Sequence, residues 1–290
     1  MTTREFAELL QSLPCPDPRQ GFFGPRSHVW AVIREAALHI AGPRALLMQI
    51  AHPLVAQGVA DHSDFRGDPY GRALRTFSAV YAIVFGTRDQ AIKAATRVHA
   101  VHQRVEGVLA EDAGRHRAGE PYRANMPHLL RWVHATLVES SLVTYERFVS
   151  PLADRGEACY REMREGAPLF GLATDALPRS CAEFRSWVAE TIDSDEIAVT
   201  STARELAESL LRGPPGLTWL SPAVRAVAAG LLPEKLRDGF GLRWRRRTRL
   251  ASRLITGAAR VTVPRVPRSL RAVPMALAAE LRCRGEPATA

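Results

Sequence analysis

The residues best suited to chemistry are histidines, and all nine fall within the first 134 residues of the 290-residue chain. His99 and His102 lie one turn apart in a stretch with helical periodicity, and His134 lies in the apolar stripe of a later helix. A buried imidazole must be hydrogen-bonded or must bind something, because an unpaired polar group is costly in an apolar core. These three side chains are therefore either satisfied core histidines or ligands of a metal or cofactor.

Two cationic side chains and one hydroxyl side chain precede these histidines in the sequence. Arg72, Arg75 and Thr76 are spaced by three and four residues, so on a helix they project toward one region. The same segment carries an apolar face that includes Phe77 and Val80. Arginine and threonine beside an apolar face suit the binding of an anionic group. The alternative is ordinary surface arginines, with Thr76 bonded back to its own helix.

A polar loop offers a second kind of site. Asp61, His62, Asp64 and Asp68 could together hold a hard divalent cation. Their spacing is not that of a calcium-binding loop, and Asp68 followed by Pro69 also fits the start of the next helix.

Several common catalytic motifs are absent from the chain. The sequence contains no glycine-rich phosphate loop, no HExxH and no GxSxG, and its four cysteines are scattered without a CxxC pair. Nucleotide binding, metalloprotease chemistry and serine hydrolysis therefore have no support. Buried histidines and arginines in a helical protein suit a cofactor cradle better.

The elements that must position these residues are helices. Apolar residues recur at three- and four-residue spacing, and no stretch shows the period-2 alternation of a strand. We predict an all-α fold, a single multi-helix globular domain with a pocket between core helices. The expected helices span residues 4–13, 28–41, 43–60 with a kink at Pro53, 69–85, 88–107, 127–149, 152–165, 180–193, 198–211, 223–232 and 243–259.

The helix over 88–107 carries two of the candidate histidines. We expect its buried stripe to consist of Ala91, Ala94, Ala95, Val98, Val101 and Val105, with His102 in the stripe and Gly107 as the stop signal. The kink at Pro53 places His52 either in a pocket wall or at a partly exposed bend. His116 and His128 fall in or beside a polar loop and are expected to be exposed.

Charge divides the chain unevenly. Residues 241–290 carry a net charge of +10, whereas residues 1–240 carry −1. We expect an N-terminal arm over 1–25, a helical domain over 26–245 and a basic Arg-rich tail over 246–290. The near-neutral body speaks against nucleic acid as a partner. No run of 18 apolar residues and no signal sequence is present, which predicts a cytoplasmic protein.

The basic tail allows two interpretations. Its helix over 243–259 combines an apolar stripe with a cationic face, which suits docking onto the body with the arginines outward, our favoured interpretation, or contact with an anionic membrane. We expect most of 265–290 to be disordered.

Six motifs, in order, resemble the rubber oxygenase (latex-clearing protein) and MpaB-type oxygenase catalytic domain family. They are GPRALLMQIAHP (42–53), GVADHS (58–63), DPYGRALRT (68–76), FG (85–86), RVHAVHQRVEG (97–107) and WVHATL (132–137). The resemblance covers roughly residues 20–245. It implies an all-helical enzyme that binds heme b between its core helices and uses dioxygen to cleave C=C bonds in isoprenoid chains.

The resemblance also implies roles for single residues. His102 matches the histidine of the family's His-x-x-Val-x-Gly segment and would bind the heme iron, with His99 as the second candidate. Arg72 and Thr76 match the distal-side pair that lines the oxygen and substrate pocket. Arg75 falls where latex-clearing proteins have a lysine. His134 would lie in the heme pocket or behind the ligand.

The departures from the family point to a smaller substrate. The chain is shorter than the latex-clearing proteins and lacks their secretion signal, so a small hydrophobic isoprenoid or other alkene fits better than a polymer. Two alternatives stay open. One is a heme-binding, heme-sensing or lipid-associated helical protein without turnover, and the other is a divalent-metal protein built on the 61–68 loop.

Overall fold

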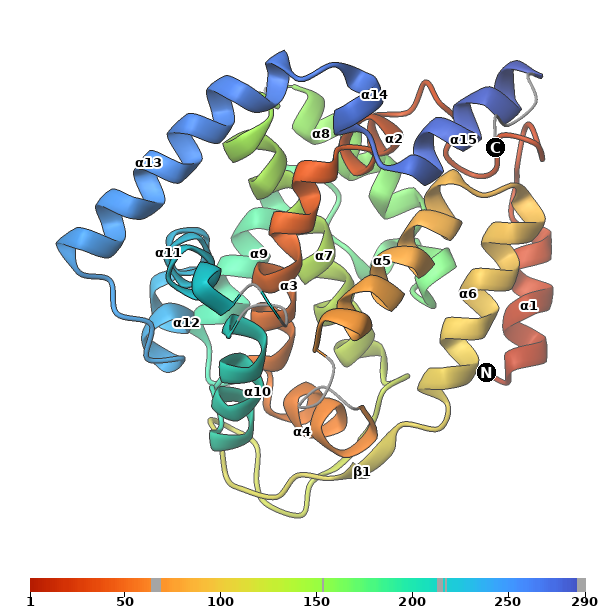
Figure 1. Ribbon diagram of the computed structural model, residues 1–290. Coiled ribbons are helices and arrows are strands. Elements are labelled where there is room, and N and C mark those ends of the chain that lie inside the picture. Colours follow the sequence, from red (N-terminus) through yellow and green to blue (C-terminus); the bar gives the residue numbers. More distant parts are fainter. Residues whose placement is uncertain (64–68, 153, 213–215, 217, 286–290) are drawn as a thin grey trace.

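Helices make up 69% of the chain in the computed structural model, which describes residues 1–290 except 64–68, 153, 213–215, 217 and 286–290 (Figure 1). The all-α prediction is confirmed. The α-helices are α1 (Thr3–Ser12), α2 (His28–Ile33), α3 (Ala41–Ile50), α4 (Pro53–His62), α5 (Pro69–Phe85), α6 (Arg88–His102), α7 (Pro127–Phe148), α8 (Arg155–Glu165), α9 (Cys181–Asp193), α10 (Ser201–Leu211), α11 (Ser221–Leu231), α12 (Glu234–Gly239), α13 (Arg246–Thr262), α14 (Arg268–Arg271) and α15 (Pro274–Arg284).

Short elements join these helices. The 3₁₀ turns are η1 (Ala36–Ile40), η2 (Ala167–Phe170), η3 (Thr174–Ala176), η4 (Thr218–Leu220) and η5 (Val263–Arg265). Two short antiparallel strands, β1 (Glu106–Val108) and β2 (Pro121–Arg123), pair with Gly107 opposite Tyr122.

The core centres on α3 and α7, which pack against each other in the middle of the molecule (Figure 1). Leu47, Met48 and Ile50 of α3 are completely buried, because this helix is apolar on almost every side. Trp132 of α7 donates from its indole nitrogen to the carbonyl of Met48 at 3.1 Å. Helices α5 and α6 lie to one side of this pair, and α10 to α12 lie to the other.

Three of the expected helices differ from their predicted bounds. The helix expected over 28–41 ends at Ile33 and is followed by η1, and the kinked helix expected over 43–60 is two helices. Pro53 is the first residue of α4, where its missing amide hydrogen removes no helical hydrogen bond. Helix α6 likewise ends at His102, and Gly107 lies in β1 rather than at a helix end.

The buried face of α6 also differs from the predicted stripe. Ala91, Ile92, Ala95 and His99 are buried, whereas Val101 is 55% exposed and His102 is only partly buried. Helix α1 covers this face, and its Phe6 ring stacks on His99 at 4.4 Å between centroids. A tertiary contact with the N-terminal segment therefore selects which of two overlapping apolar stripes is buried.

The C-terminal segment is ordered, so the prediction of disorder over most of 265–290 is wrong for the part that is described. Helix α13 packs on α11 and α7, as docking of the tail predicts, and α15 packs along α5. Ala276 and Ala279 of α15 are buried in the same core cluster as Phe6.

Arg44 is the buried cation that ties α3 to α7 and α11. Its side chain is 2% exposed and forms an ion pair with Glu139. It also donates from Nε to the carbonyl of Leu231 at 2.9 Å and from Nη1 to the hydroxyl of Ser140 at 2.6 Å.

We expect Arg44→Ala to lower the free energy of unfolding by about 3–5 kcal/mol, because it leaves a buried carboxylate and a carbonyl without their partner. Urea denaturation followed by circular dichroism measures the change. Arg249→Ala, on the exposed face of α13, is the matched control and should change stability by less than about 0.5 kcal/mol. Equal effects of the two substitutions would contradict a structural role for the buried guanidinium.

Candidate active site

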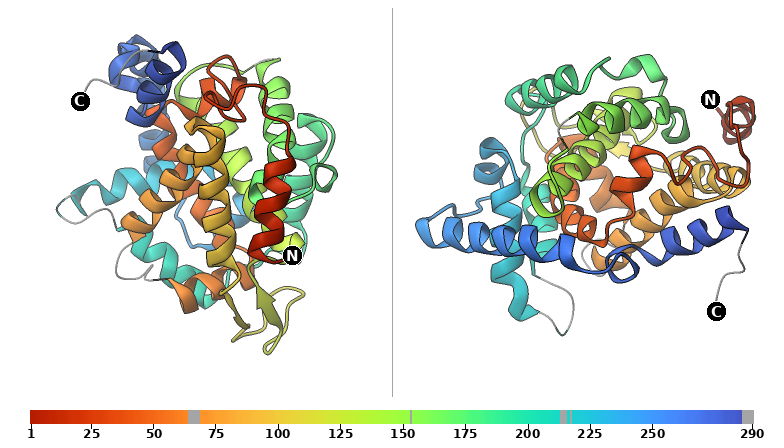
Figure 2. Two further views of the ribbon diagram at one scale, coloured as in Figure 1. Left: turned by 90° about the vertical axis from the view of Figure 1, so that its right-hand side faces the viewer. Right: turned by 90° about the horizontal axis from the view of Figure 1, so that it is seen from above.

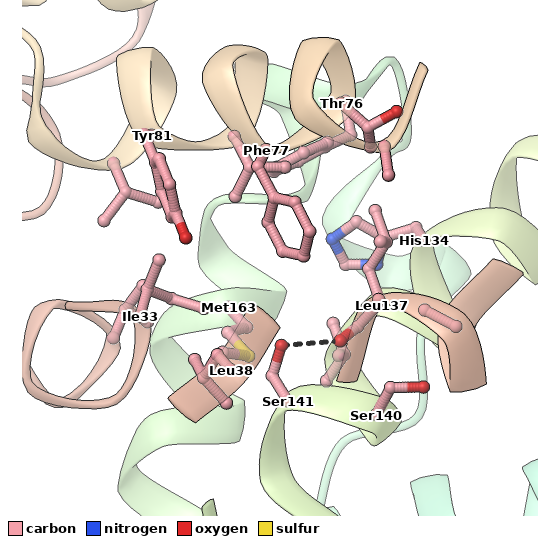
Figure 3. Close-up of a pocket in the computed structure, with 18 of the residues that line it drawn as sticks. Ile33, Leu38, Thr76, Phe77, Tyr81, His134, Leu137, Ser140, Ser141 and Met163 are labelled. Carbon is pink, nitrogen blue, oxygen red and sulfur yellow. Dashed lines mark hydrogen bonds between the residues drawn. The ribbon is translucent and has the colours of Figure 1, made fainter. Parts of the chain in front are cut away.

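A mostly apolar cavity lies between α5 and α7, with α2 and α3 forming further walls (Figure 3). Its empty space is about 930 Å³, a figure that includes the open solvent at its mouth. The polar residues in its wall are Gln49, Thr76, Tyr81, His134, Ser140 and Ser141. The composition suits a hydrophobic molecule with few polar groups.

His134 supplies the cavity's unsatisfied polar atom. Its side chain is buried, and its ring packs edge-to-face with Phe170, with 4.9 Å between the ring centroids. Its Nδ1 has no hydrogen-bond partner among the described residues. Burial lowers the pKa of His134 to about 4, so the imidazole is neutral at pH 7. An orphaned neutral imidazole in an apolar cavity is a candidate ligand or hydrogen-bonding group for a bound molecule.

The other polar side chains of the wall are engaged within the protein. Ser141 donates to the carbonyl of Leu137 at 2.8 Å, and Ser140 accepts from Arg44. The Tyr81 hydroxyl lies 3.1 Å from His39 Nε2, and burial raises the pKa of Tyr81 to about 12. Nothing in the spacing connects Tyr81 to His39, 42 residues earlier, so this contact could not be predicted from the sequence.

The residues Arg72, Arg75 and Thr76 do not all point to one place. Thr76 lines the cavity, with its hydroxyl donating to the carbonyl of Arg72 at 3.1 Å, which is the back-bonding that the sequence left as an alternative. Arg75 is exposed. Burial, aided by the nearby charge of Arg75, lowers the pKa of Arg72 to about 10, which still leaves Arg72 positively charged at pH 7.

His102 does not line the cavity. Burial, with smaller contributions from the charges of His99 and Arg72, lowers the pKa of His102 to about 4. His102 is therefore a neutral imidazole at pH 7, within electrostatic range of the cation Arg72. Helix α6, which carries it, also packs on η2, the turn that supplies Phe170 to the cavity.

His99 is a packed core histidine. It is buried under α1, stacks on Phe6, and has its Nε2 3.0 Å from the side-chain nitrogen of Gln103. Burial lowers the pKa of His99 as well. The charges of His99 and Arg72 both act on His102, and His134 and Thr76 line the same cavity, whereas the His99 ring itself is packed under α1.

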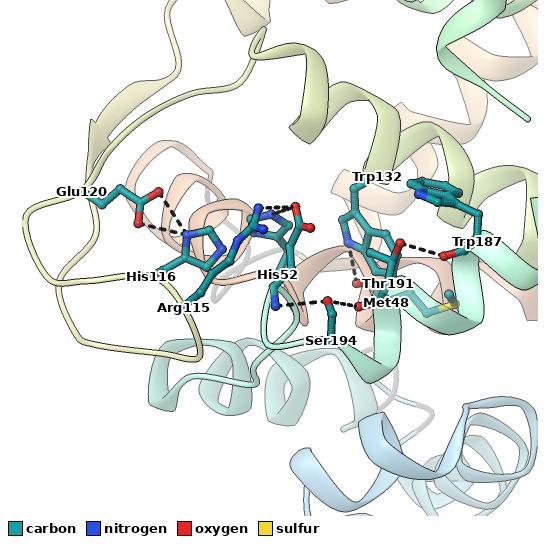
Figure 4. Close-up of polar contacts among 10 residues, drawn as sticks. Met48, His52, Arg115, His116, Glu120, Trp132, Trp187, Thr191 and Ser194 are labelled. Carbon is teal, nitrogen blue, oxygen red and sulfur yellow. Dashed lines mark hydrogen bonds and ion pairs between the residues drawn. The ribbon is translucent and has the colours of Figure 1, made fainter.

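A second group of histidines lies where α3 meets α4, outside the cavity wall (Figure 4). The rings of His52 and His116 are 5.1 Å apart between centroids. A carboxylate oxygen of Glu196 is 3.8 Å from His52 Nε2 and 3.1 Å from Arg115, and Glu120 contacts His116 Nδ1 at 3.0 Å. These contacts join the segment after α6 to the start of α4 and to the connection between α9 and α10.

This group was not predicted from the sequence. His52 was expected either in a pocket wall or at a partly exposed bend, but it is completely buried and does not line the cavity. His116 was expected to be exposed and is 3% exposed, whereas the exposure of His128 is confirmed. The pKa of His52 is lowered chiefly by burial, with Glu196 opposing the shift. No sequence signal connects these residues, because they come from separate segments.

The polar loop gives little support to a divalent-metal site. Asp61 accepts from Gln57 at 2.9 Å and from Tyr122 at 2.7 Å, and His62 Nε2 lies 2.8 Å from the carbonyl of Glu106. Asp64 and Asp68 lie outside the described residues. In the described part of the chain, no group of three or more His, Cys, Asp or Glu side chains is arranged to hold a metal ion.

Comparison with known protein families identifies the class. Residues 30–261 match the family described as ER-bound oxygenase mpaB/B'/rubber oxygenase, catalytic domain. The chain belongs to this oxygenase family, which confirms the resemblance seen in the sequence motifs. Searches of curated proteins and of solved structures give no significant match. None of the described helices is long and apolar enough to cross a membrane.

We expect the protein to lose stability in mild acid through His134. Because its pKa is about 4 when folded and about 6.5 when unfolded, the stabilisation is fully present above pH 6.5 and is lost as the pH falls toward 4. Between about pH 7.5 and about pH 5 the loss attributable to His134 is roughly 2 kcal/mol.

Urea denaturation of the wild type and of His134→Gln at both pH values measures this loss. The variant should show a correspondingly weaker pH dependence, whereas the exposed substitution Arg97→Gln should leave it unchanged. A variant with the full pH dependence of the wild type would show that His134 is not the responsible group.

Proposed function

We propose that this protein is a heme b-dependent oxygenase that uses dioxygen on a small hydrophobic substrate, such as an isoprenoid or another alkene. Membership of the family supports an oxygenase activity. The residues of the site support the use of heme and of a small hydrophobic substrate. The observation that carries the proposal is that His102 is a neutral imidazole within electrostatic range of the cation Arg72, which lies on α5, the helix whose Ala73, Thr76 and Phe77 line the apolar cavity.

The residues present fit a heme in their chemistry. Heme requires one neutral imidazole for iron, an apolar slot, and cationic or hydroxylic partners for its carboxylates. His102 is our candidate for the iron ligand, because its lowered pKa keeps the ligating nitrogen unprotonated at neutral pH. His134, with its unpartnered Nδ1, is the second candidate.

The chain's own residues would divide the work as follows. Heme iron, when bound, would supply the activation of dioxygen. Arg72 supplies a fixed positive charge for an anionic group, and Thr76, whose hydroxyl bonds back to the carbonyl of Arg72, lines the cavity. The aliphatic side chains of α2, α3 and α7, together with Phe77 of α5 and Phe170 of η2, would exclude water and hold the hydrocarbon part of the substrate.

We expect His102→Ala to abolish heme retention, because it removes the neutral, partly buried imidazole that we propose as the iron ligand. The Soret absorbance per protein after expression with a heme precursor measures this loss, and added imidazole should restore part of it. His99→Ala should retain heme, since His99 is packed under α1, and exposed His128→Ala is the control. Full retention by His102→Ala with loss in His134→Ala would move the iron ligand to His134.

Turnover separates an oxygenase from a heme-binding protein without activity. We expect Arg72→Ala and Thr76→Val each to keep heme and to reduce product formation by roughly a hundredfold, the usual effect of removing a donor from an oxygenase or hydrolase site. Oxygen uptake with lipophilic alkenes, together with product detection, measures this. Arg97→Ala, on the exposed face of α6, is the matched arginine control. Unchanged turnover in both site variants would favour the sensing or storage alternative.

A further inference from the structure

Helix α13 has two unlike faces, one docked and one exposed. Its inner face packs on α11, where Ser252 is buried against Gly230 so closely that any side chain at Gly230 would collide with it. Ala259 and Val263 pack against a cluster formed by Phe148, Val149 and Leu231. This face explains why α13 is held on the body, so the opposite face is free to serve another purpose.

The outer face carries an apolar ridge. Leu250, Leu254 and Val261 are 57%, 63% and 54% exposed, and their spacing of four and seven residues puts them on one line along the helix. Further exposed apolar side chains follow in the chain, with Leu270 at 76% and Met275 at 41%. Helices α13, α14 and α15 form one continuous belt along one side of the molecule (Figure 2).

Arginines flank this ridge without being neutralised. Arg246, Arg249, Arg253 and Arg260 lie on one side of it by helical position and Arg247 on the other, and all five are exposed. None of the five has an ion-pair partner among the residues that the structure describes. The arginines nearer α15 differ, because Arg268 pairs with Glu280 and Arg271 with Glu35.

We propose that the outer face of α13 docks on an anionic lipid surface, with Leu250, Leu254 and Val261 entering the interface and the flanking arginines contacting lipid phosphates. An apolar ridge bordered by arginines is the pattern of helices that lie in the plane of a membrane interface. Nucleic acid would use the arginines but would leave the aliphatic ridge in water, and the ridge contains no aromatic side chain on which bases could stack. The charge and the apolar exposure together therefore favour lipid.

The proposal is tested with the full chain and two kinds of vesicle, neutral phosphatidylcholine alone and phosphatidylcholine with anionic phosphatidylglycerol. We expect cosedimentation with the anionic vesicles, little with the neutral ones, and weakening as salt rises. The triple variant Arg246→Gln, Arg249→Gln, Arg253→Gln should bind on the order of a hundredfold more weakly, since each arginine near the surface contributes about a fivefold change.

Two further variants keep the test specific. Leu250→Ser with Leu254→Ser should weaken vesicle binding even at low salt, because it removes the inserted ridge. Arg97→Gln, Arg161→Gln, Arg179→Gln removes the same charge from exposed positions on α6, on α8 and before α9, and it should bind like the wild type. Circular dichroism and thermal unfolding establish that each variant is folded.

Three outcomes would overturn the proposal. Equal loss in the two triple arginine variants would indicate a general charge effect. Binding to duplex DNA that competes with vesicles, with the leucine variant unaffected, would assign the face to nucleic acid. A dimer in solution that the leucine variant dissociates, without vesicle binding by the wild type, would assign it to a second copy of the chain. Vesicle binding requires no heme or turnover, so this test stands apart from that of the proposed function.

Discussion

Desolvation sets the chemical state of the imidazoles in this protein. Water stabilises the charged form of histidine, so a ring that is removed from water without a nearby carboxylate becomes harder to protonate. His102 and His134 both have pKa values near 4 for this reason, and neither has a carboxylate among the causes of its shift. His52 differs, because Glu196 partly opposes the effect of burial. His102 and His134 are therefore neutral at pH 7, and the neutral imidazole is the form that binds a metal.

Helix α5 is the element that relates these two imidazoles. One side of this 17-residue helix packs against α6, and another side lines the cavity together with α3 and α7. Arg72 acts on His102 at the end of α6, and Thr76, one turn later, faces the cavity that contains His134. Helix α5 therefore carries both the Arg72 cation and the Thr76 hydroxyl. The sequence motif places these two residues four positions apart, but it does not show that they face different neighbours.

The sequence predicted the helices well where local signals agree with packing. The bounds of α5 follow from Pro69 at its first position and from Gly86 after Phe85, and both signals act within the segment itself. The end of α6 was missed, because the β1–β2 pairing draws Gly107 into a strand and this depends on Tyr122. The buried face of α6 was missed because α1 covers it, and the burial of His116 because Glu120 and His52 enclose it.

The candidate site, like the helices, was predicted from the sequence only in part. Residue types, spacing and the family resemblance selected His102, His134, Arg72 and Thr76. In the structure His134 and Thr76 line one cavity, and the charge of Arg72 acts on His102. The cavity itself could not be predicted, since its wall combines residues from α2 to η2 that are as far apart in sequence as Phe23 and Phe170. His99 shows why spacing is insufficient: it has the same periodicity as His102 but is packed beneath Phe6.

Different kinds of contact hold different parts of the C-terminal tail on the body. Glu35 is 1% exposed and lies 3.5 Å from both Arg34 and Arg271, so the arginine at the end of α14 is part of the packing that holds the tail. The backbone joins there as well, with the amide of Val273 donating to the carbonyl of Arg34 at 2.8 Å. Glu35 of the body and Glu280 of α15 neutralise arginines of α14, whereas α13 is attached to the body mainly through its inner face. The exposed arginines of α13 consequently have no carboxylate partner among the described residues.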